Sequence, residues 1–127
     1  MPLVKINLRK NRSPSEKKSV SDAVQATLVS VLGIPNEDFY QLINEYAPES
    51  FLHSDGYLGC TYSQNLLMIE IAFIQGRSDE LKKALHKELN ARLVATGVVS
   101  EDDVFVVISE FGRANVSFGK GLAQRAE

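Results

Sequence analysis

Cysteine is almost absent from this chain. Its 127 residues include a single cysteine, Cys60, so no disulfide can form within the chain, and this usage is typical of a reducing compartment. The N-terminus lacks the long apolar segment of a signal peptide, and no hydrophobic run is long enough to cross a bilayer. We therefore expect a cytoplasmic protein with no membrane partner.

An excess of charge of one sign is also missing. The formal net charge is -2, so no overall basic field exists that would attract nucleic acid. The chain contains no phosphate-binding loop, no dinucleotide-binding fingerprint and no zinc signature, and His53 and His86 have no partner at metal-ligand spacing. These absences predict no nucleic-acid partner, no cofactor and no metal site.

Hydrophobic residues make up 44% of the chain and charged residues 24%, values typical of one globular domain. In the first half, residues 3–8 alternate between two faces, as in a half-buried strand. A Ser-Pro-Ser-Glu capping box at residues 13–16 begins a predicted helix, and Gly33 ends it. Residues 38–43 are predicted to form a second strand, parallel to the first across a right-handed crossover.

The second half repeats this order after a polar, turn-rich stretch. Residues 47–65 are predicted to form functional loops or short irregular hairpins. Residues 66–74 have the composition of a buried strand, Ser78 caps a second helix that Gly97 closes, and residues 104–108 form a fourth strand.

The two halves align residue for residue over much of their length. Ser13 falls on Ser78 and Asp38 on Asp103, an offset of 65 residues that slips by one near the glycines that end the helices. We therefore predict an α+β fold: a tandem β-α-β repeat with a four-stranded mixed sheet and two helices on one face. The single domain divides into repeat one (2–46), connecting loops (47–65), repeat two (66–111) and a C-terminal hairpin or tail (112–127).

Pro2 carries the chemistry that we predict. A pseudo-twofold axis relating the halves sets the first and third strands antiparallel, which brings residues 75–77 beside Pro2. Loss of Met1 would make the Pro2 nitrogen a secondary amine, and burial near a guanidinium lowers the pKa of such an amine toward neutrality, where acid–base catalysis is most efficient. Arg77 could bind a substrate carboxylate bidentately, next to the free amides that begin a helix. The alternatives are an ordinary first-strand proline and a surface arginine.

Three further residues are candidates for the same site. Asp38 could orient a water molecule or stabilise a cationic amine, and its alternative role is a turn carboxylate. Tyr40 and Phe118 could form the wall of a pocket, although aromatic residues near apolar strands usually belong to the core.

These residues resemble the tautomerase superfamily, whose members use an amino-terminal proline on a β-α-β scaffold. The segment 76–82, Gly-Arg-Ser-Asp-Glu-Leu-Lys, is similar to the Gly-Arg-Ser segment of 4-oxalocrotonate tautomerase. Residues 1–3 (Met-Pro-Leu), Ile34-Pro35 with Asp38 and Tyr40, and residues 117–119 (Ser-Phe-Gly) look like the fused-repeat branch that includes malonate semialdehyde decarboxylase. Two positions depart from that branch: Gln75 replaces an arginine and Val116 replaces a tryptophan.

The resemblance implies a homotrimeric enzyme that acts on a small 2-oxo or 3-oxo carboxylate without a cofactor. In it Pro2 is the catalytic group, Arg77 binds the carboxylate and Asp38 is an assisting acid, with Gln75, Tyr40 and Phe118 as substrate-binding residues. Keto–enol tautomerisation is the first expected reaction. Decarboxylation or hydration of a malonate-semialdehyde-like acid is the alternative, and a non-catalytic ligand-binding module is the second alternative.

Overall fold

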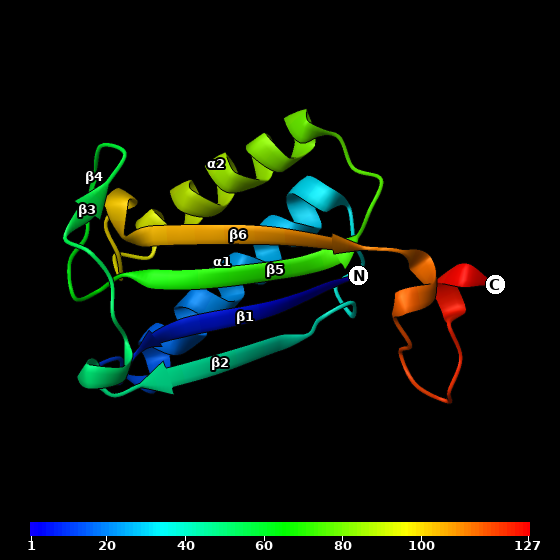
Figure 1. Ribbon diagram of the computed structural model, residues 1–127, viewed down its shortest axis with the longest axis horizontal. Helices are drawn as coiled ribbons and strands as arrows, with labels where there is room; N and C mark the ends of the chain where they lie inside the picture. The colour runs from blue at the N-terminus through cyan, green and yellow to red at the C-terminus, as the bar shows by residue number, and fades with distance from the viewer.

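The computed structural model, which describes residues 1–127, consists of one four-stranded mixed sheet with two helices packed against one of its faces (Figure 1). The strand order is β2-β1-β5-β6, and a separate two-stranded hairpin lies at one end of the sheet. This architecture confirms the predicted α+β fold. Its elements are β1 (Pro2–Arg9), α1 (Pro14–Leu32), β2 (Gln41–Tyr46), β3 (Gly56–Tyr57), β4 (Cys60–Thr61), β5 (Leu67–Ile74), α2 (Asp79–Ala95) and β6 (Val104–Phe111).

Both helices begin where their capping residues predicted. The Ser13 hydroxyl accepts a hydrogen bond from the Glu16 N–H, and the Glu16 carboxylate accepts one from the Ser13 N–H at 3.0 Å, which completes the capping box. Gly33 then ends α1 with φ 70°, a conformation that glycine adopts without a steric penalty. The Ser78 hydroxyl caps α2 in the same way by accepting from the Leu81 N–H.

The sheet joins the two repeats at its centre. Strands β1 and β5 are antiparallel and pair Pro2 with Phe73, whereas β1–β2 and β5–β6 are parallel. This pairing confirms that the end of the third long strand lies beside the start of the first. Alternate residues of β1 and β5 face the helices and form the core, which includes Val4, Ile6, Leu8, Leu67, Ile69, Ile71 and Phe73.

The predicted start of the second strand is wrong. Strand β2 covers Gln41–Tyr46, so Asp38 lies in the turn before it instead of at its start. Pairing with β1 begins at Val4, whose N–H donates to the Tyr40 carbonyl at 3.0 Å. Pro2 has no N–H to continue this ladder, whereas the equivalent Leu67 begins the pairing of β5 with β6.

Other boundaries differ less. Strand β6 runs to Phe111, three residues beyond the predicted end at Ile108, because all eight residues of β5 pair with it. The connecting stretch contains the β3–β4 hairpin, as expected for a short irregular element. The C-terminal segment, predicted to be a hairpin or tail, contains two short 3-10 turns, Arg113–Asn115 and Gln124–Ala126, beyond the end of β6 (Figure 1). No helix is both long and apolar enough to traverse a bilayer.

Equivalent ion pairs show how closely the halves correspond. In the first repeat Lys17 pairs with Glu45 at 2.9 Å, and in the second Lys82 pairs with Glu110 at 2.6 Å. Each pair ties the first turns of a helix to the end of the strand that follows it. The repeat detected in the sequence is therefore a repeat of side-chain contacts as well as of elements.

Candidate functional site

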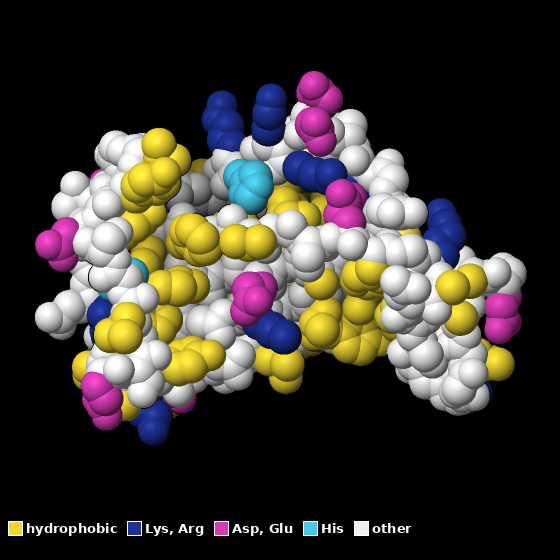
Figure 2. Space-filling model, in the orientation of Figure 1, with side chains coloured by type: hydrophobic (Ala, Val, Ile, Leu, Met, Phe, Trp, Pro, Cys, Tyr) yellow, Lys and Arg dark blue, Asp and Glu magenta, His cyan; other side chains and the backbone are white.

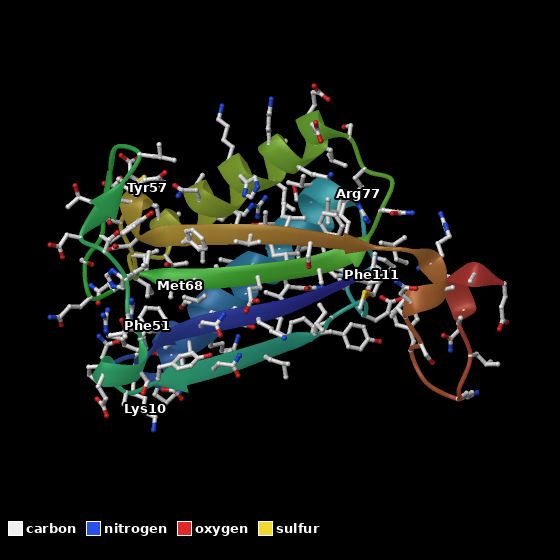
Figure 3. The ribbon with its side chains drawn as sticks, in the orientation of Figure 1. Lys10, Phe51, Tyr57, Met68, Arg77 and Phe111 are labelled. Carbon is white, nitrogen blue, oxygen red and sulfur yellow. The ribbon has the colours of Figure 1, made fainter.

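A cavity of about 430 Å³ lies where β1 begins and β5 ends. This is the end of the sheet from which the C-terminal segment extends, and Arg77 and Phe111 lie there together (Figure 3). The cavity is lined by backbone or side-chain atoms of Met1, Leu32, Gly33, Ile34, Pro35, Asp38, Ile74, Gln75, Gly76, Arg77, Arg113 and Arg125. It therefore brings the N-terminus together with Asp38, Gln75 and Arg77, three of the predicted site residues.

The N-terminus and Asp38 form an ion pair inside this cavity. The Met1 amino nitrogen lies 3.2 Å from Asp38 Oδ2, and both side chains are about nine-tenths buried. The other carboxylate oxygen, Oδ1, is buried and has no hydrogen-bond partner within the chain. Two backbone bonds position Asp38: its N–H donates to the Pro35 carbonyl at 3.1 Å, and its carbonyl accepts from the Gln25 amide at 3.1 Å. Asp38 is thus held in place, with one oxygen on the terminal amine and the other buried without a partner.

Pro2 lies directly behind Met1. It is buried, pairs with Phe73 of β5 and has its side chain on the helix-facing side of the sheet. With Met1 in place, the Pro2 nitrogen is that of a tertiary amide, whose lone pair is delocalised and does not accept a proton.

Arg77 is held in an orientation that leaves its donors available. Its guanidinium stacks over the Phe73 ring, 4.8 Å from the centroid, and Nη1 donates to the Ile74 carbonyl at 3.2 Å. No carboxylate lies within 4.0 Å of it. Since the guanidinium has five N–H donors, most of them remain free for an anion. Gly76, with φ 123°, makes the turn that places Arg77 directly before α2.

Tyr40 and Phe118 lie in an adjoining cavity of about 360 Å³. Their ring centroids are 6.1 Å apart, and Asp38 and Arg125 line both cavities. The two predicted aromatic residues therefore contact each other beside the Arg77 cavity but do not line it. Gln75 does line the Arg77 cavity, and its N–H donates to the Phe111 carbonyl at 2.9 Å.

Two arginines that line the cavity were not predicted from the sequence. Arg113 and Arg125 come from the two 3-10 turns of the C-terminal segment, and Arg113 Nη1 donates to the Arg125 carbonyl at 3.4 Å. Neither residue belongs to a helical or strand periodicity, so no pattern placed them near Arg77. A signal did exist in the composition, since these arginines flank a segment that contains no acidic residue from 113 to 126.

The corresponding position in the other repeat is closed. Arg12, equivalent to Arg77, donates to the Val98 carbonyl at 3.1 Å and to the Asn65 carbonyl at 2.6 Å. Burial lowers the pKa of the Arg12 guanidinium, while the charges of Glu16 and Asp103 oppose that shift. Asp103, equivalent to Asp38, is occupied by the Ser63 N–H at 2.8 Å. Protein groups thus fill the second position.

Another cavity of comparable volume, about 420 Å³, lies on the open face of the sheet near the hairpin end. Its lining is largely apolar, Glu70 is its only charged residue, and it includes none of the predicted site residues. No group of three or more His, Cys, Asp or Glu side chains is arranged to hold a metal ion. The concentration of charged and unpaired polar groups makes the Arg77 cavity the candidate site.

Comparisons with known proteins agree with this fold. Two family models, each described as tautomerase enzyme, match residues 38–119 and residues 2–59. The probable tautomerase YusQ of Bacillus subtilis (strain 168) is 30% identical over 127 residues, which span 100% of both chains. A crystal structure of FG41 malonate semialdehyde decarboxylase inhibited by 3-bromopropiolate has a TM-score of 0.91 and 32% identity, covering 98% of this chain and 94% of the other. A fused 4-OT wild-type symmetric trimer has a TM-score of 0.80 and 25% identity, covering 98% of both chains.

Proposed function

Because this chain belongs to the tautomerase superfamily, we propose that it is an enzyme in which the Pro2 amine moves a proton on a small 2-oxo or 3-oxo carboxylate. One observation carries the proposal. The Met1 amino group lies 3.2 Å from Asp38 in the cavity that Arg77 also lines. Removal of Met1 would leave the ring nitrogen of Pro2 as the terminal amine at the edge of this cavity.

In tautomerisation, Arg77 binds the substrate carboxylate through two parallel N–H donors and so fixes the carbon chain beside the amine. Neutral Pro2 removes a proton from the carbon next to the keto group. The electron pair of the C–H bond forms the C=C bond of the enolate while the π pair of the C=O bond moves to oxygen. The protonated amine then donates its proton to that oxygen, which gives the enol. Gln75, also in the cavity, is an amide donor available to the developing oxyanion.

Decarboxylation of a 3-oxo acid is the second reaction, and the similarity to malonate semialdehyde decarboxylase together with Asp38 favours it. A carboxylate beside the amine stabilises its protonated form. Protonated Pro2 then donates to the carbonyl oxygen while the bond to the carboxylate breaks, its electrons form the enol and CO2 leaves. Hydration is the related alternative for the same protonated amine.

The test begins with the intact mass of protein that starts at its native residue. We expect this mass to show the loss of Met1. Tautomerisation is then followed by NMR in D2O as proton–deuterium exchange at carbon 3 of 2-oxopentanoate. Decarboxylation is assayed in parallel as release of CO2 from malonate semialdehyde. The variant Pro2→Ala keeps a terminal amine but loses the ring, and a Gly-Ser extension before Met1 removes the amine from the site. Pro14→Ala, at the first turn of α1, is the matched control.

We expect both altered N-termini to lose at least tenfold in the active reaction, as for removal of an acid–base group. Full activity in the extended protein would contradict the role of Pro2, whereas no activity in any version, the unaltered protein included, would favour a non-catalytic binding module. The pKa of the Pro2 amine, followed by 15N NMR, separates the reactions: a value near neutrality favours tautomerisation and a raised value favours decarboxylation or hydration.

We further propose that the protein is a homotrimer located in the cytoplasm. The sheet face without helices exposes apolar side chains, among them Leu42 and Val107, at 51% and 47% of their surface. Figure 2 shows hydrophobic groups gathered over this face, and the fused 4-OT structure with the same fold is a trimer. The single free thiol, Cys60, supports the location. Light scattering is expected to give three times the 14.0 kDa chain mass.

A further inference from the structure

The turn between α1 and β2 carries Asp38, and one side chain of α1 bonds to it. This turn, residues 35–38, lies beside the N-terminus (Figure 1). The Gln25 amide, from the middle of α1, donates to the Asn36 carbonyl at 3.3 Å and to the Asp38 carbonyl at 3.1 Å. No other side chain forms a hydrogen bond with the main chain of this turn. Gln25 therefore makes the only hydrogen bonds between α1 and the turn.

The Asp38 carboxylate needs such a restraint because its burial is unfavourable. Its Oδ2 is paired with the terminal amine at 3.2 Å, and its Oδ1 is buried with no hydrogen-bond partner. A buried carboxylate oxygen without a hydrogen bond raises the free energy of the folded state. A turn that was free to move would bring this group into water and away from the amine. The main chain of the turn therefore has to hold the carboxylate in place.

The second repeat contains the same helix-to-turn bond with a shorter side chain. Asn90 on α2 is equivalent to Gln25, and its amide donates to the Glu101 carbonyl at 2.9 Å. Since Glu101 is equivalent to Asn36, the two repeats share this contact. The Asn90 amide forms no bond with the Asp103 carbonyl, the equivalent of the second contact of Gln25. The additional methylene of glutamine thus reaches one carbonyl further, and that carbonyl belongs to the aspartate.

The aspartate of the second repeat does not depend on this bond. The Asp103 carboxylate accepts directly from the Ser63 N–H at 2.8 Å and from the Ser63 and Ser100 hydroxyls. Asp38 has no such donors around its carboxylate. The longer side chain, Gln25, therefore occurs in the repeat whose carboxylate is held only through its main chain.

We propose that Gln25 is a positioning residue, which holds Asp38 against the terminal amine and so keeps that amine protonated up to a higher pH. The proposal rests on the proposed function, because Pro2 is taken to be this amine once Met1 is lost. A nearby carboxylate favours the cationic form of an amine. Gln25 carries no charge, so its effect on the amine depends on where it places Asp38.

The first experiment titrates the amine in protein with the native N-terminus by 15N NMR. Gln25→Ala removes both bonds and is expected to lower the pKa of the amine by at least about 0.5, a fraction of the roughly 1–3 that a nearby opposite charge produces. Gln25→Asn has the reach of Asn90, so it should keep the bond to Asn36, lose the bond to Asp38 and lower the pKa as well. Asn90→Ala is the matched control and should leave the pKa unchanged.

The comparison isolates Asp38 because the rest of the charged surroundings stay the same. The other charged side chains around the amine are Arg77, Arg113 and Arg125 in this cavity and Glu37 in the adjoining one. An unchanged pKa in both Gln25 variants would overturn the proposal, and so would an equal lowering in Asn90→Ala. Thermal unfolding checks that each variant is folded. A merely structural bond would give similar losses of stability in the two alanine variants and no change in pKa.

The second experiment tests whether Gln25 acts through Asp38. In a chain that already carries Asp38→Asn, the further substitution Gln25→Ala is expected to leave the pKa of the amine unchanged. A lowering as large as in the unaltered background would show another route and overturn the proposal.

The pH dependence of the reaction separates this proposal from the proposed function. Proton–deuterium exchange at carbon 3 of 2-oxopentanoate is measured against pH, and in Gln25→Ala its profile should move to lower pH together with the pKa of the amine. If Pro2→Ala leaves exchange unchanged while Gln25→Ala lowers the pKa of the amine, the catalytic role of Pro2 fails and the positioning role stands. If exchange depends on Pro2 but neither the pKa nor the profile moves in Gln25→Ala, the positioning role fails and the catalytic role stands.

Discussion

At the scale of single residues, the same amino acid has opposite surroundings in the two repeats. Arg12 donates to two main-chain carbonyls, whereas its equivalent, Arg77, donates to one and keeps its other donors free. Asp103 is likewise occupied by Ser63, while one oxygen of Asp38 has no partner. A repeat in the sequence therefore identifies which positions correspond, but not which of them is free to bind a ligand.

This difference predicts that two matched substitutions change different properties, one the activity and the other the stability. Arg77→Gln is expected to lower kcat/KM for an oxo acid by about 10- to 100-fold, because a hydrogen bond to a charged group contributes roughly 1.5–3 kcal/mol. Its thermal stability should change little. Arg12→Gln is expected to lower the free energy of unfolding by about 1–3 kcal/mol through the carbonyls it leaves unsatisfied. Urea unfolding and steady-state kinetics of both variants check this, and equal effects on activity would argue against the assignment.

At the scale of elements, the caps and turns explain why the secondary structure was largely predictable. The Ser13 capping box and the Ser78 cap gave the two helix starts correctly, and the glycines after them gave the ends within a few residues. The predicted start of β2 was wrong because the pairing of β1 with β2 depends on Pro2, which lacks the N–H needed for it. The apolar alternation of the sequence contains no information on this pairing. Arg113 and Arg125 were missed because their turns depend on contacts with Gln124 and Phe118, which have no periodic signature. The site was therefore predictable where it is built on strand and helix ends, and unpredictable where the C-terminal segment completes it.

The capping box of α1 predicts a pH-dependent contribution to stability. The Ser13 N–H donates to the Glu16 carboxylate and lowers the pKa of Glu16 in the folded protein. A lowered folded pKa means that the unfolded chain binds protons first as pH falls, so this contribution is present above about pH 4.5 and is lost in more acidic solution. Glu16→Gln keeps an acceptor at the cap but cannot titrate. It should lose stability less steeply than the unaltered protein between about pH 5 and pH 3. Glu49→Gln, at an exposed position, should follow the unaltered curve in the same denaturation series.

The β3–β4 hairpin predicts a sharp difference between two glycines. A Cβ on Gly56 would collide with the Cys60 carbonyl across the hairpin, whereas a Cβ on Gly112 would meet nothing within 4 Å. Gly56→Ala is therefore expected to destabilise the hairpin by about 1–3 kcal/mol, as for other overpacked positions. Gly112 has an ordinary φ of -76°, so Gly112→Ala should leave the stability unchanged. Hydrogen exchange at the Tyr62 amide, which bonds to Asp55 across the hairpin base, reports the opening, and equal protection in both variants would refute the steric explanation.

At the scale of the whole molecule, the sheet has one face covered by helices and one open face with apolar side chains. If copies of the chain assemble through the open face, Val107→Glu places charges in the interface and should dissociate the trimer without unfolding the monomer. Val94→Glu, which alters a valine of 37% exposure on α2, is the matched control and should leave the assembly intact. Analytical ultracentrifugation distinguishes these results, and a trimer that survives Val107→Glu would place the interface elsewhere.

The contacts that fill the position around Arg12 also determine how mutations in the two repeats affect the protein. In the first repeat the arginine is part of the scaffold, and in the second it stays available to small molecules. Mutations around Arg12 are therefore expected to lower the amount of folded protein in the cell. Mutations around Arg77 are expected to lower the proposed activity without lowering that amount. A deep mutational scan scored separately for abundance and for growth would divide the chain at its internal repeat.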